Sequence, residues 1–214
     1  TEAFFDELIA FARAHNVLIV QDAAYATLNY GDQRLSILGR PGGKEAALEI
    51  HSMSKSYNMT GWRLGFVAGS APVVQAFAEV KDNTDSGQFP AIQVAACAGI
   101  ADVALSESIR AHYHRRLTKL AALLRDAGFD AAVPGGTFFM YVGAPSGAGD
   151  LAFASGEDAS QYLIRDHSIS TVPWDDAGHF LRFSATFEAA DETDEDRVLA
   201  ELARRLADAG LRFD

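Results

Sequence analysis

The chain opens with a helical pattern and then alternates short apolar runs with polar turns. In EAFFDELIAFARAH (2–15) large apolar side chains recur at helical spacing, so we predict a helix that Asn16 ends. Three short apolar runs follow: VLIVQD (17–22), ALEIHS (47–52) and LGFVAG (64–69). Each is predicted to be a strand. The first two end in polar residues, which is typical of buried strands whose carboxyl ends carry function.

Helical spacing dominates the middle of the chain. PVVQAFAEVKDN (72–83) predicts a helix with a proline in its first turn, and SGQFP ends it. Residues 91–127 predict one long helix, with a candidate interruption near LSES (105–108). Gly128 follows as a candidate C-cap, because glycine readily adopts the left-handed conformation that ends a helix.

After Gly128 the chain reads as a compact mixture of strands and helices. We therefore expect two α/β units with a boundary near residue 107: residues 1–107 in one layered domain and residues 108–214 in a smaller α+β domain, joined by the long helix. The expected elements are strands at 135–144, 168–173 and 179–186, helices at 158–167 and 194–210, and a flexible segment at 146–157.

The charge balance restricts the classes of partner. The chain has 214 residues, with 18 Lys plus Arg, 29 Asp plus Glu and a formal net charge of −11. This balance argues against binding to nucleic acid or to anionic membranes, since both favour a basic face. No apolar run reaches the length of a membrane span, and no signal peptide is evident at the start. A small anionic ligand remains compatible, because its site needs only a few cations.

The cysteine and histidine counts bear on the cellular compartment and on metal binding. Cys97 is the single cysteine, so no disulfide framework can form and a reducing compartment, the cytoplasm, is expected. Cys97 itself is expected to be a small buried hydrophobic residue. The six histidines lack metal-ligand spacing, so no metal site is predicted. Because the first residue is Thr1 rather than methionine, we expect that the chain begins within a longer sequence or was processed.

The stretch HSMSKSYNMTGWRLG (51–65) concentrates reactive side chains. Lys55 comes just after a predicted strand, with the hydroxyl groups of Ser52 and Ser54 before it and Arg63 after it. An amine that acts as a nucleophile must be neutral part of the time, and a neighbouring cation lowers its pKa in that direction. Arginine also binds phosphate through two parallel hydrogen bonds. The stretch therefore fits a phosphorylated carbonyl compound that is held covalently.

The end of the first predicted strand adds a second set of polar groups. QDAAY places Asp22 and Tyr25 three residues apart, just past that strand. An ionised carboxylate can pair with a protonated ring nitrogen, and a tyrosine hydroxyl can donate to a phenolate oxygen. These are the two polar ends of a pyridoxal ring, for which an acid at the pyridinium nitrogen is the expected partner.

Three motifs together resemble a known family. DAAY (22–25), SMSKSYNMTGWRLG (52–65) and FLRFS (180–184) occur in the order and with the gaps of the fold-type I pyridoxal-phosphate enzymes, specifically the class I/II aminotransferases. The resemblance implies the C-terminal part of a large pyridoxal 5′-phosphate-binding α/β domain, with a mixed, mostly parallel sheet, followed by the small domain. It also implies a homodimer that moves an amino group between an amino acid and a 2-oxo acid.

The resemblance assigns roles around the cofactor. By it, Asp22 pairs with the pyridine nitrogen, Tyr25 pairs with the ring hydroxyl, and Ser52 and Arg63 hold the phosphate. Lys55 forms the Schiff base with the cofactor and then moves the proton between the substrate Cα and the cofactor.

A further arginine and three neighbouring residues complete this interpretation. Arg182 in FLRFS is implied to bind the substrate α-carboxylate through its two-pronged guanidinium. Ser54 either touches the phosphate or shapes the turn. Tyr57 and Trp62 are expected to belong to the core, since most bulky aromatic residues near a strand do.

The substrate is less firmly indicated than the family. No arginine lies between Arg63 and Arg110, where aspartate-type members carry one, and the segment reads KDNTDSGQFPAIQ (81–93) instead. That segment looks most like the bacterial LL-diaminopimelate aminotransferase branch, which would place the protein in lysine biosynthesis. Alanine-, aspartate- and methionine-type members stay open. So do a C–S β-lyase and a non-catalytic aminotransferase-like sensor domain fused to a DNA-binding module, although the acidic charge weighs against the last.

Family members are longer on the N-terminal side. They carry there a phosphate loop, an aromatic residue that stacks on the ring, and a tyrosine that reaches the partner subunit. The 214 residues look like the C-terminal half or more of such an enzyme. We expect this piece to bind cofactor poorly by itself.

Overall fold

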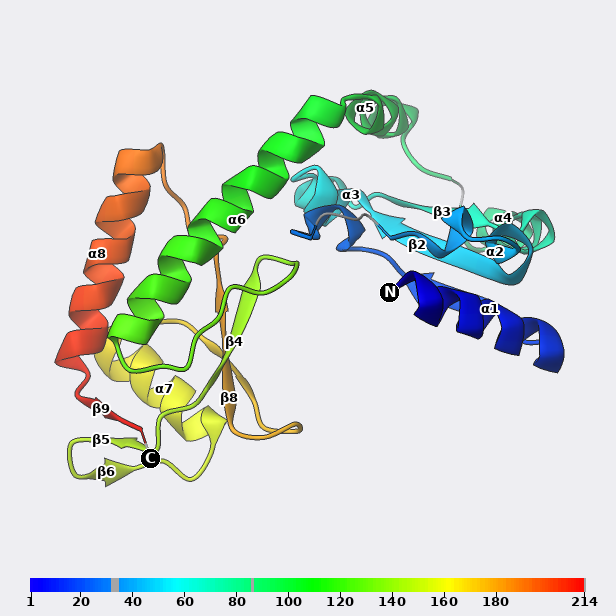
Figure 1. The fold of residues 1–214 in the computed structure, drawn as a ribbon. Helices are drawn as coiled ribbons and strands as arrows, with labels where there is room; N and C mark the ends of the chain where they lie inside the picture. The colour runs from blue at the N-terminus through cyan, green and yellow to red at the C-terminus, as the bar shows by residue number, and fades with distance from the viewer. Residues whose placement is uncertain (32–34, 86, 214) are drawn as a thin grey trace. The chain divides into compact units, whose positions relative to one another are not determined.

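The computed structural model describes residues 1–31, 35–85 and 87–213. Their contacts divide the chain into two compact units, Thr1–Ala111 and His112–Asp214. Figure 1 shows the helices and strands of both units. The domain boundary expected near residue 107 stays a prediction.

The first unit is a small sheet with helices around it. Its elements are α1 (Glu2–His15), β1 (Ile19–Asp22), η1 (Ala26–Leu28), η2 (Ile37–Gly39), α2 (Gly43–Ala46), β2 (Ala47–Ser52), α3 (Met53–Ser56), η3 (Thr60–Trp62), β3 (Gly65–Gly69), α4 (Ala71–Thr84), α5 (Pro90–Ala101) and the first turns of α6 (Val103–Asp126).

Helix α1 occupies the predicted range because both of its ends are capped. The Thr1 hydroxyl accepts a hydrogen bond from the amide of Phe4 at 3.2 Å, which satisfies one of the free amides of the first turn. At the other end Asn16 adopts the left-handed conformation, with φ 52°. The buried Ile9 of α1 packs with Ile37 and Ala47 and so ties the helix to the sheet.

The sheet of the first unit has the order β1-β2-β3, with β1 and β2 parallel and β2 and β3 antiparallel. The strands were expected to be buried, and this is only half correct. Alternate side chains of a strand face opposite sides of a sheet. Ile19 packs into the core beside α1, whereas Val20 is 55% exposed and Ile50 is 42% exposed on the side that the described residues leave partly open.

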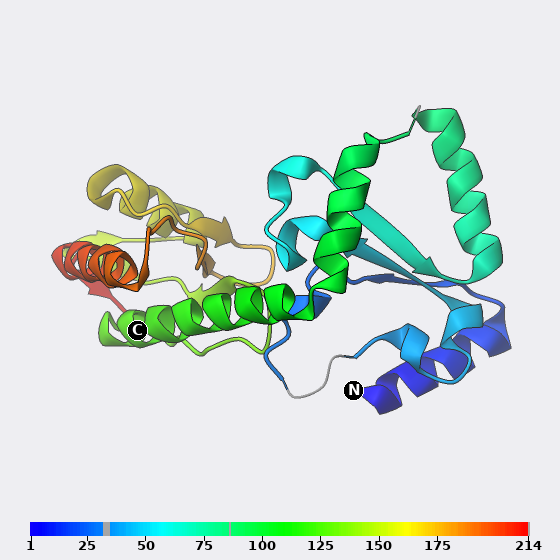
Figure 2. The same cartoon turned by 90° about the horizontal axis from the view of Figure 1, so that it is seen from above.

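The long helix expected over 91–127 is in fact two helices, α5 and α6, and the break lies at Asp102 rather than near 105–108 (Figure 2). Asp102 is extended, and its carboxylate accepts a hydrogen bond from the amide of Leu105 at 3.0 Å, so it caps α6. Ser86, in the break expected before these helices, lies outside the described residues. No single described helix meets the length and apolarity of a membrane span, although α5 and α6 taken together as a bent pair do.

The predicted cap at Gly128 has the geometry expected of it. Its φ is 96°, the Gly128 amide donates to the Arg125 carbonyl at 2.9 Å, and the Phe129 amide donates to the Leu124 carbonyl at 2.9 Å. This pair of hydrogen bonds is the Schellman arrangement, which satisfies carbonyl groups at the end of α6.

The second unit contains two antiparallel sheets and the remaining helices. In the main sheet, of order β4-β8-β7, the side chains of Met140, Val142, Leu181 and Phe183 are buried on one face, and α7 packs against β7 and β8. Besides α6, the elements are β4 (Phe139–Gly143), β5 (Gly147–Ala148), β6 (Leu151–Ala152), α7 (Gly156–His167), β7 (Val172–Trp174), β8 (Phe180–Ser184), α8 (Glu192–Asp208) and β9 (Leu211–Arg212).

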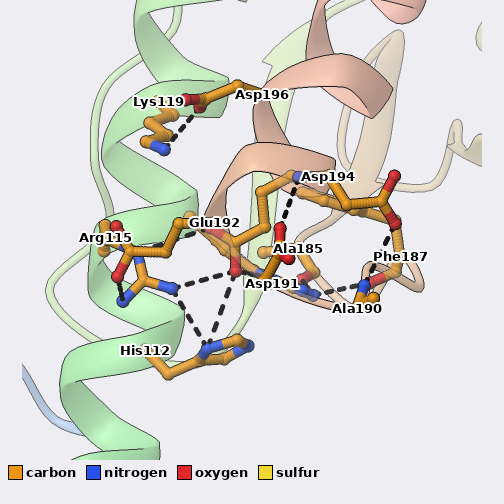
Figure 3. A network of polar contacts seen from close by, with 12 residues as sticks. His112, Arg115, Lys119, Ala185, Phe187, Ala190, Asp191, Glu192, Asp194 and Asp196 are labelled. Carbon is orange, nitrogen blue, oxygen red and sulfur yellow. Dashed lines mark hydrogen bonds and ion pairs between the residues drawn. The ribbon is translucent and has the colours of Figure 1, made fainter.

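A buried ion cluster joins α6 to α8 within this unit (Figure 3). The Glu195 side chain is 2% exposed and accepts hydrogen bonds from Arg116 Nε at 2.8 Å and Arg115 Nη2 at 2.9 Å. Arg116 also donates to the carbonyl groups of Ala185 and Phe187. The cluster therefore fixes the chain directly after β8 against both helices.

Candidate functional site

The predicted cofactor residues of the first unit lie where two neighbouring strands end. Asp22 is the last residue of β1, and Ser52 is the last residue of β2. The strands are parallel, with Asp22 opposite Ile50. Beyond the last pair, the Ala23 amide still donates to the Ile50 carbonyl at 2.8 Å. The loops after β1 and β2 therefore leave the same edge of the sheet, which is the edge where α/β folds bind ligands.

Asp22 is exposed and has one oxygen already engaged. Its Oδ1 accepts a hydrogen bond from the Ala24 amide at 3.1 Å, an Asx-type turn that directs the chain away from the strand. Tyr25 follows at the start of η1, and η1 contacts α3. The local turn thus brings the tyrosine-bearing segment against the helix that carries Lys55.

The turn that carries Lys55 is a single helical turn fixed at both ends. Ser52 caps α3, because its Oγ accepts from the Ser54 amide at 3.2 Å. Met53 is fully buried, packs with Leu64, and donates its amide to the Leu64 carbonyl at 3.1 Å. Lys55 is half-buried, and it makes no hydrogen bond or ion pair with the described residues. The backbone of this turn is therefore fixed, while the Lys55 amine has no hydrogen-bond or ion-pair partner among the described residues.

Arg63 is held beside the same turn. It adopts the left-handed conformation with φ 53°, which is uncommon for a residue with a side chain and marks a constrained position. Its Nη1 donates to the Thr60 carbonyl at 3.2 Å, and Thr60 Oγ1 donates to the Ser54 carbonyl at 3.0 Å. The rest of the exposed guanidinium keeps donors that can bind an anion.

The donor set of this edge fits pyridoxal 5′-phosphate. Ser52 and Arg63 offer a hydroxyl and a guanidinium to a phosphate, and Lys55 offers an amine to an aldehyde carbon. Asp22 Oδ2 has no hydrogen bond with the described residues and could pair with a protonated ring nitrogen, and Tyr25 could donate to the ring oxygen.

Arg182 belongs to the second unit and sits on the central strand of its main sheet. It lies opposite Tyr141 of β4 and Val172 of β7. Its guanidinium carbon lies 4.2 Å from the centre of the Phe139 ring and 5.7 Å from the centre of the Trp174 ring. The predicted carboxylate-binding arginine is therefore surrounded by aromatic rings.

The structure corrects two minor expectations and adds two residues. Trp62 is 48% exposed, not part of the core, and Cys97 is exposed rather than buried. Tyr57 does pack against the buried Met53 cluster, as expected. The rings of Phe139 and Trp174 beside Arg182 were not predicted. Alternation in GGTFFMYVGA puts Phe139 and Tyr141 on one face of a strand, but this pattern does not include Trp174.

Comparisons with known proteins find the same family that the three motifs indicate. The family model described as aminotransferase class I and II matches residues 1–200. The chain is 50% identical over 220 residues to the LL-diaminopimelate aminotransferase of Methanococcus maripaludis, and 47% identical over 222 residues to that of Methanocaldococcus jannaschii. Each alignment covers 100% of this chain and 53% of the relative, so the chain spans about half the length of these curated relatives.

Solved structures of similar fold include aminotransferases. Substrate-bound BacF from Bacillus subtilis matches with a TM-score of 0.86 and 28% identity, over 100% of this chain and 53% of that one. An aminotransferase from Staphylococcus aureus matches with a TM-score of 0.81 and 28% identity, over 97% and 54%. The fold expected from the sequence, a portion of an aminotransferase of mixed α/β type, is confirmed.

Proposed function

Since the chain belongs to the class I and II aminotransferase family, we propose that the intact protein moves an amino group between an amino acid and a 2-oxo acid with pyridoxal 5′-phosphate as cofactor. The observation that carries this proposal is the Lys55 turn. A half-buried lysine without a partner among the described residues stands directly after β2, on the edge at which Asp22 ends β1.

In this proposal each residue of the edge holds one part of the cofactor. The Asp22 carboxylate keeps a proton on the ring nitrogen, and the Tyr25 hydroxyl binds the ring oxygen. Ser52 and Arg63 bind the phosphate through charge-assisted hydrogen bonds. When bound, the cofactor supplies an electron sink for the negative charge that develops at the substrate Cα.

Lys55 has two tasks in the proposed reaction. Its amine would hold the cofactor covalently, and once the substrate amine had displaced it, it would carry a proton to and from the substrate Cα. Arg182, in the second unit, is proposed to bind the α-carboxylate of the substrate, because a guanidinium matches a carboxylate with two parallel hydrogen bonds.

The proposed substrates are LL-diaminopimelate and 2-oxoglutarate, which would place the protein in lysine biosynthesis. This proposal is supported by the names of the relatives that share 50% and 47% of their aligned residues with the chain. A homodimer and a cytoplasmic location, expected from the sequence, belong to the same proposal.

Assays of the intact protein with competing amino donors test this function. With 2-oxoglutarate as acceptor, we expect glutamate to form fastest from LL-diaminopimelate, and more slowly from aspartate, alanine or methionine. Lys55→Ala should abolish the reaction. Lys44→Ala, which changes an exposed lysine of α2, should not.

Two other outcomes would point to the alternatives. Release of pyruvate from a sulfur-containing amino acid without any 2-oxo acid would indicate a C–S β-lyase. Cofactor binding without turnover of any donor would indicate a sensor domain, and would contradict the proposed activity.

A further inference from the structure

One face of the main sheet in the second unit is aromatic around a single arginine. Side chains two residues apart on a strand share a face, and so do residues directly opposite on neighbouring strands. Arg182 therefore shares its face with Phe139 and Tyr141 of β4, with Trp174 of β7 and with Phe180 of β8. Tyr141 and Trp174 are 45% and 40% exposed, so this face is open in the unit.

Among the described residues, the guanidinium of Arg182 contacts aromatic rings and no acid. Both ring contacts, at 4.2 Å to Phe139 and 5.7 Å to Trp174, lie within the range of a cation–π interaction. With the described residues Arg182 makes no hydrogen bond or ion pair. Helical arginines of the same unit behave differently, since Arg115 and Arg205 both donate to glutamates.

This difference matters for a residue that must bind a carboxylate. A neighbouring acid would hold the guanidinium in place, but it would occupy the same N–H donors that a ligand needs. An aromatic face attracts the cation through the ring quadrupole and leaves those donors at the edge of the plane free. Rings can therefore orient an arginine without competing with its ligand.

The rings are themselves fixed by their neighbours. The Phe139 ring contacts Phe138 with centres 4.7 Å apart, and the Trp174 ring meets Tyr141 edge to face at 5.7 Å. The turn directly after Trp174 is fastened to α7, because the Asp175 carboxylate accepts from the Gly156 amide at 2.7 Å and from the Glu157 amide at 3.0 Å.

We propose that Phe139 and Trp174 are positioning residues that hold the Arg182 guanidinium by its π face, so that its fork stays unpaired and correctly oriented for a substrate carboxylate. The inference rests on the proposed function, because it takes Arg182 as the carboxylate-binding residue. It adds two side chains, Phe139 and Trp174, whose proposed role is to orient Arg182 and not to bind the ligand.

The test measures carboxylate binding in the intact protein, apart from turnover. Glutarate serves as the probe, since it carries the two carboxylates of 2-oxoglutarate and lacks the reacting carbonyl group. Phe139→Leu removes the ring but keeps an apolar side chain, and it should raise the Kd of glutarate by about 3–10-fold, as expected for loss of a cation–π contact. KM for the amino donor and for 2-oxoglutarate should rise by the same factor, with kcat nearly unchanged.

Three comparison variants separate positioning from general stability. Phe139→Tyr keeps the ring and should restore wild-type Kd and KM. Arg182→Lys keeps the charge, loses the fork and should weaken glutarate more than Phe139→Leu does. Phe129→Leu removes a buried ring of the same unit that contacts Phe183 and not Arg182, so it should lower the melting temperature without changing the Kd of glutarate.

Distinct results would overturn the inference. If Phe139→Leu and Trp174→Leu both bind glutarate like wild type, the rings do not position Arg182, while the proposed function stands. If Phe139→Leu does not fold, the partly exposed Trp174→Leu decides alone, with a smaller rise expected from its longer contact. If glutarate binding is unaffected by Arg182→Lys, the arginine is not the carboxylate site and the inference fails. If the wild type binds glutarate through Arg182 but transaminates no donor, the proposed function fails and the positioning role remains.

Discussion

At the residue scale, the proposed chemistry depends on one carboxylate at the end of β1. Asp22 is the last residue of that strand, and the hydrogen bond from Ala24 to Oδ1 holds the carboxylate in place. In the proposed function the other oxygen, which has no hydrogen bond with the described residues, would keep a proton on the ring nitrogen. The role is electrostatic, so it requires the negative charge and not only the shape of the side chain.

Asp22→Asn therefore separates charge from shape. We expect the variant to keep bound cofactor, visible as an absorbance band, while kcat falls by roughly 10²-fold or more, the scale for loss of a positioned catalytic group. Asp82→Asn, on the exposed side of α4, is the control and should behave like wild type. Unchanged transamination by the Asp22→Asn protein would refute the role.

Residues of the Lys55 turn could be predicted from the sequence because they are close together along it. Ser52, Lys55 and Arg63 lie within twelve positions, and a short cap and turn hold them. The surroundings of Arg182 could not be predicted in the same way. Phe139 and Trp174 come from two other strands, so their contact with Arg182 depends on strand register, which the sequence pattern alone does not determine.

At the element scale, helices with clear caps were predicted well and short elements were not. The ends of α1 and α6 lie within one residue of their predicted positions, because Asn16 and Gly128 adopt left-handed conformations there. Single-turn elements such as α2 and α3 are too short to show a period. The break between α5 and α6 was predicted at the wrong position. The apolar pattern continues through Asp102, but its carboxylate caps α6 by accepting a hydrogen bond from the Leu105 amide.

The ion cluster between α6 and α8 makes a prediction about stability and pH. Burial raises the pKa of Glu195, but hydrogen bonds from Arg115 and Arg116 outweigh this effect and hold the pKa below its ordinary value of 4.5. A carboxyl with a lowered folded-state pKa adds stability above its unfolded pKa and loses it as the pH falls through the folded value. The second unit should therefore lose stability on acidification below about pH 4.5.

The substitution Glu195→Gln tests how much this ion cluster contributes to stability. Loss of the charge leaves Arg116 buried without its counter-ion, so the free energy of unfolding at pH 7 should fall by about 3 kcal/mol. On acidification the variant should lose less stability than the wild type, by the part that Glu195 contributes, while Asp175, Asp194 and Glu201, whose pKa values are also lowered, keep their own contributions. Asp196→Asn breaks a more exposed pair with Lys119 on the same two helices and should cost no more than about 1 kcal/mol. Equal effects from the two variants in denaturant titrations would show that burial does not strengthen the cluster.

At the scale of the whole molecule, the family was evident from three motifs spread over both units. The class I and II aminotransferase assignment is confirmed over residues 1–200, which contain every predicted site residue. The sequence pattern did not predict burial in the first unit correctly. Val20, Ile50 and Cys97 are exposed, although each lies in an apolar run that indicated a buried position. The homodimer stays a prediction, which light scattering of the intact protein would check.

The most direct test of the central claim is to find which lysine holds the cofactor. The intact protein, loaded with pyridoxal 5′-phosphate, is treated with borohydride, digested and analysed by mass spectrometry. We predict that the visible absorbance band disappears and that the reduced cofactor is found on Lys55, with no such label in Lys55→Ala. Label on Lys44, Lys81 or Lys119 instead would contradict the account.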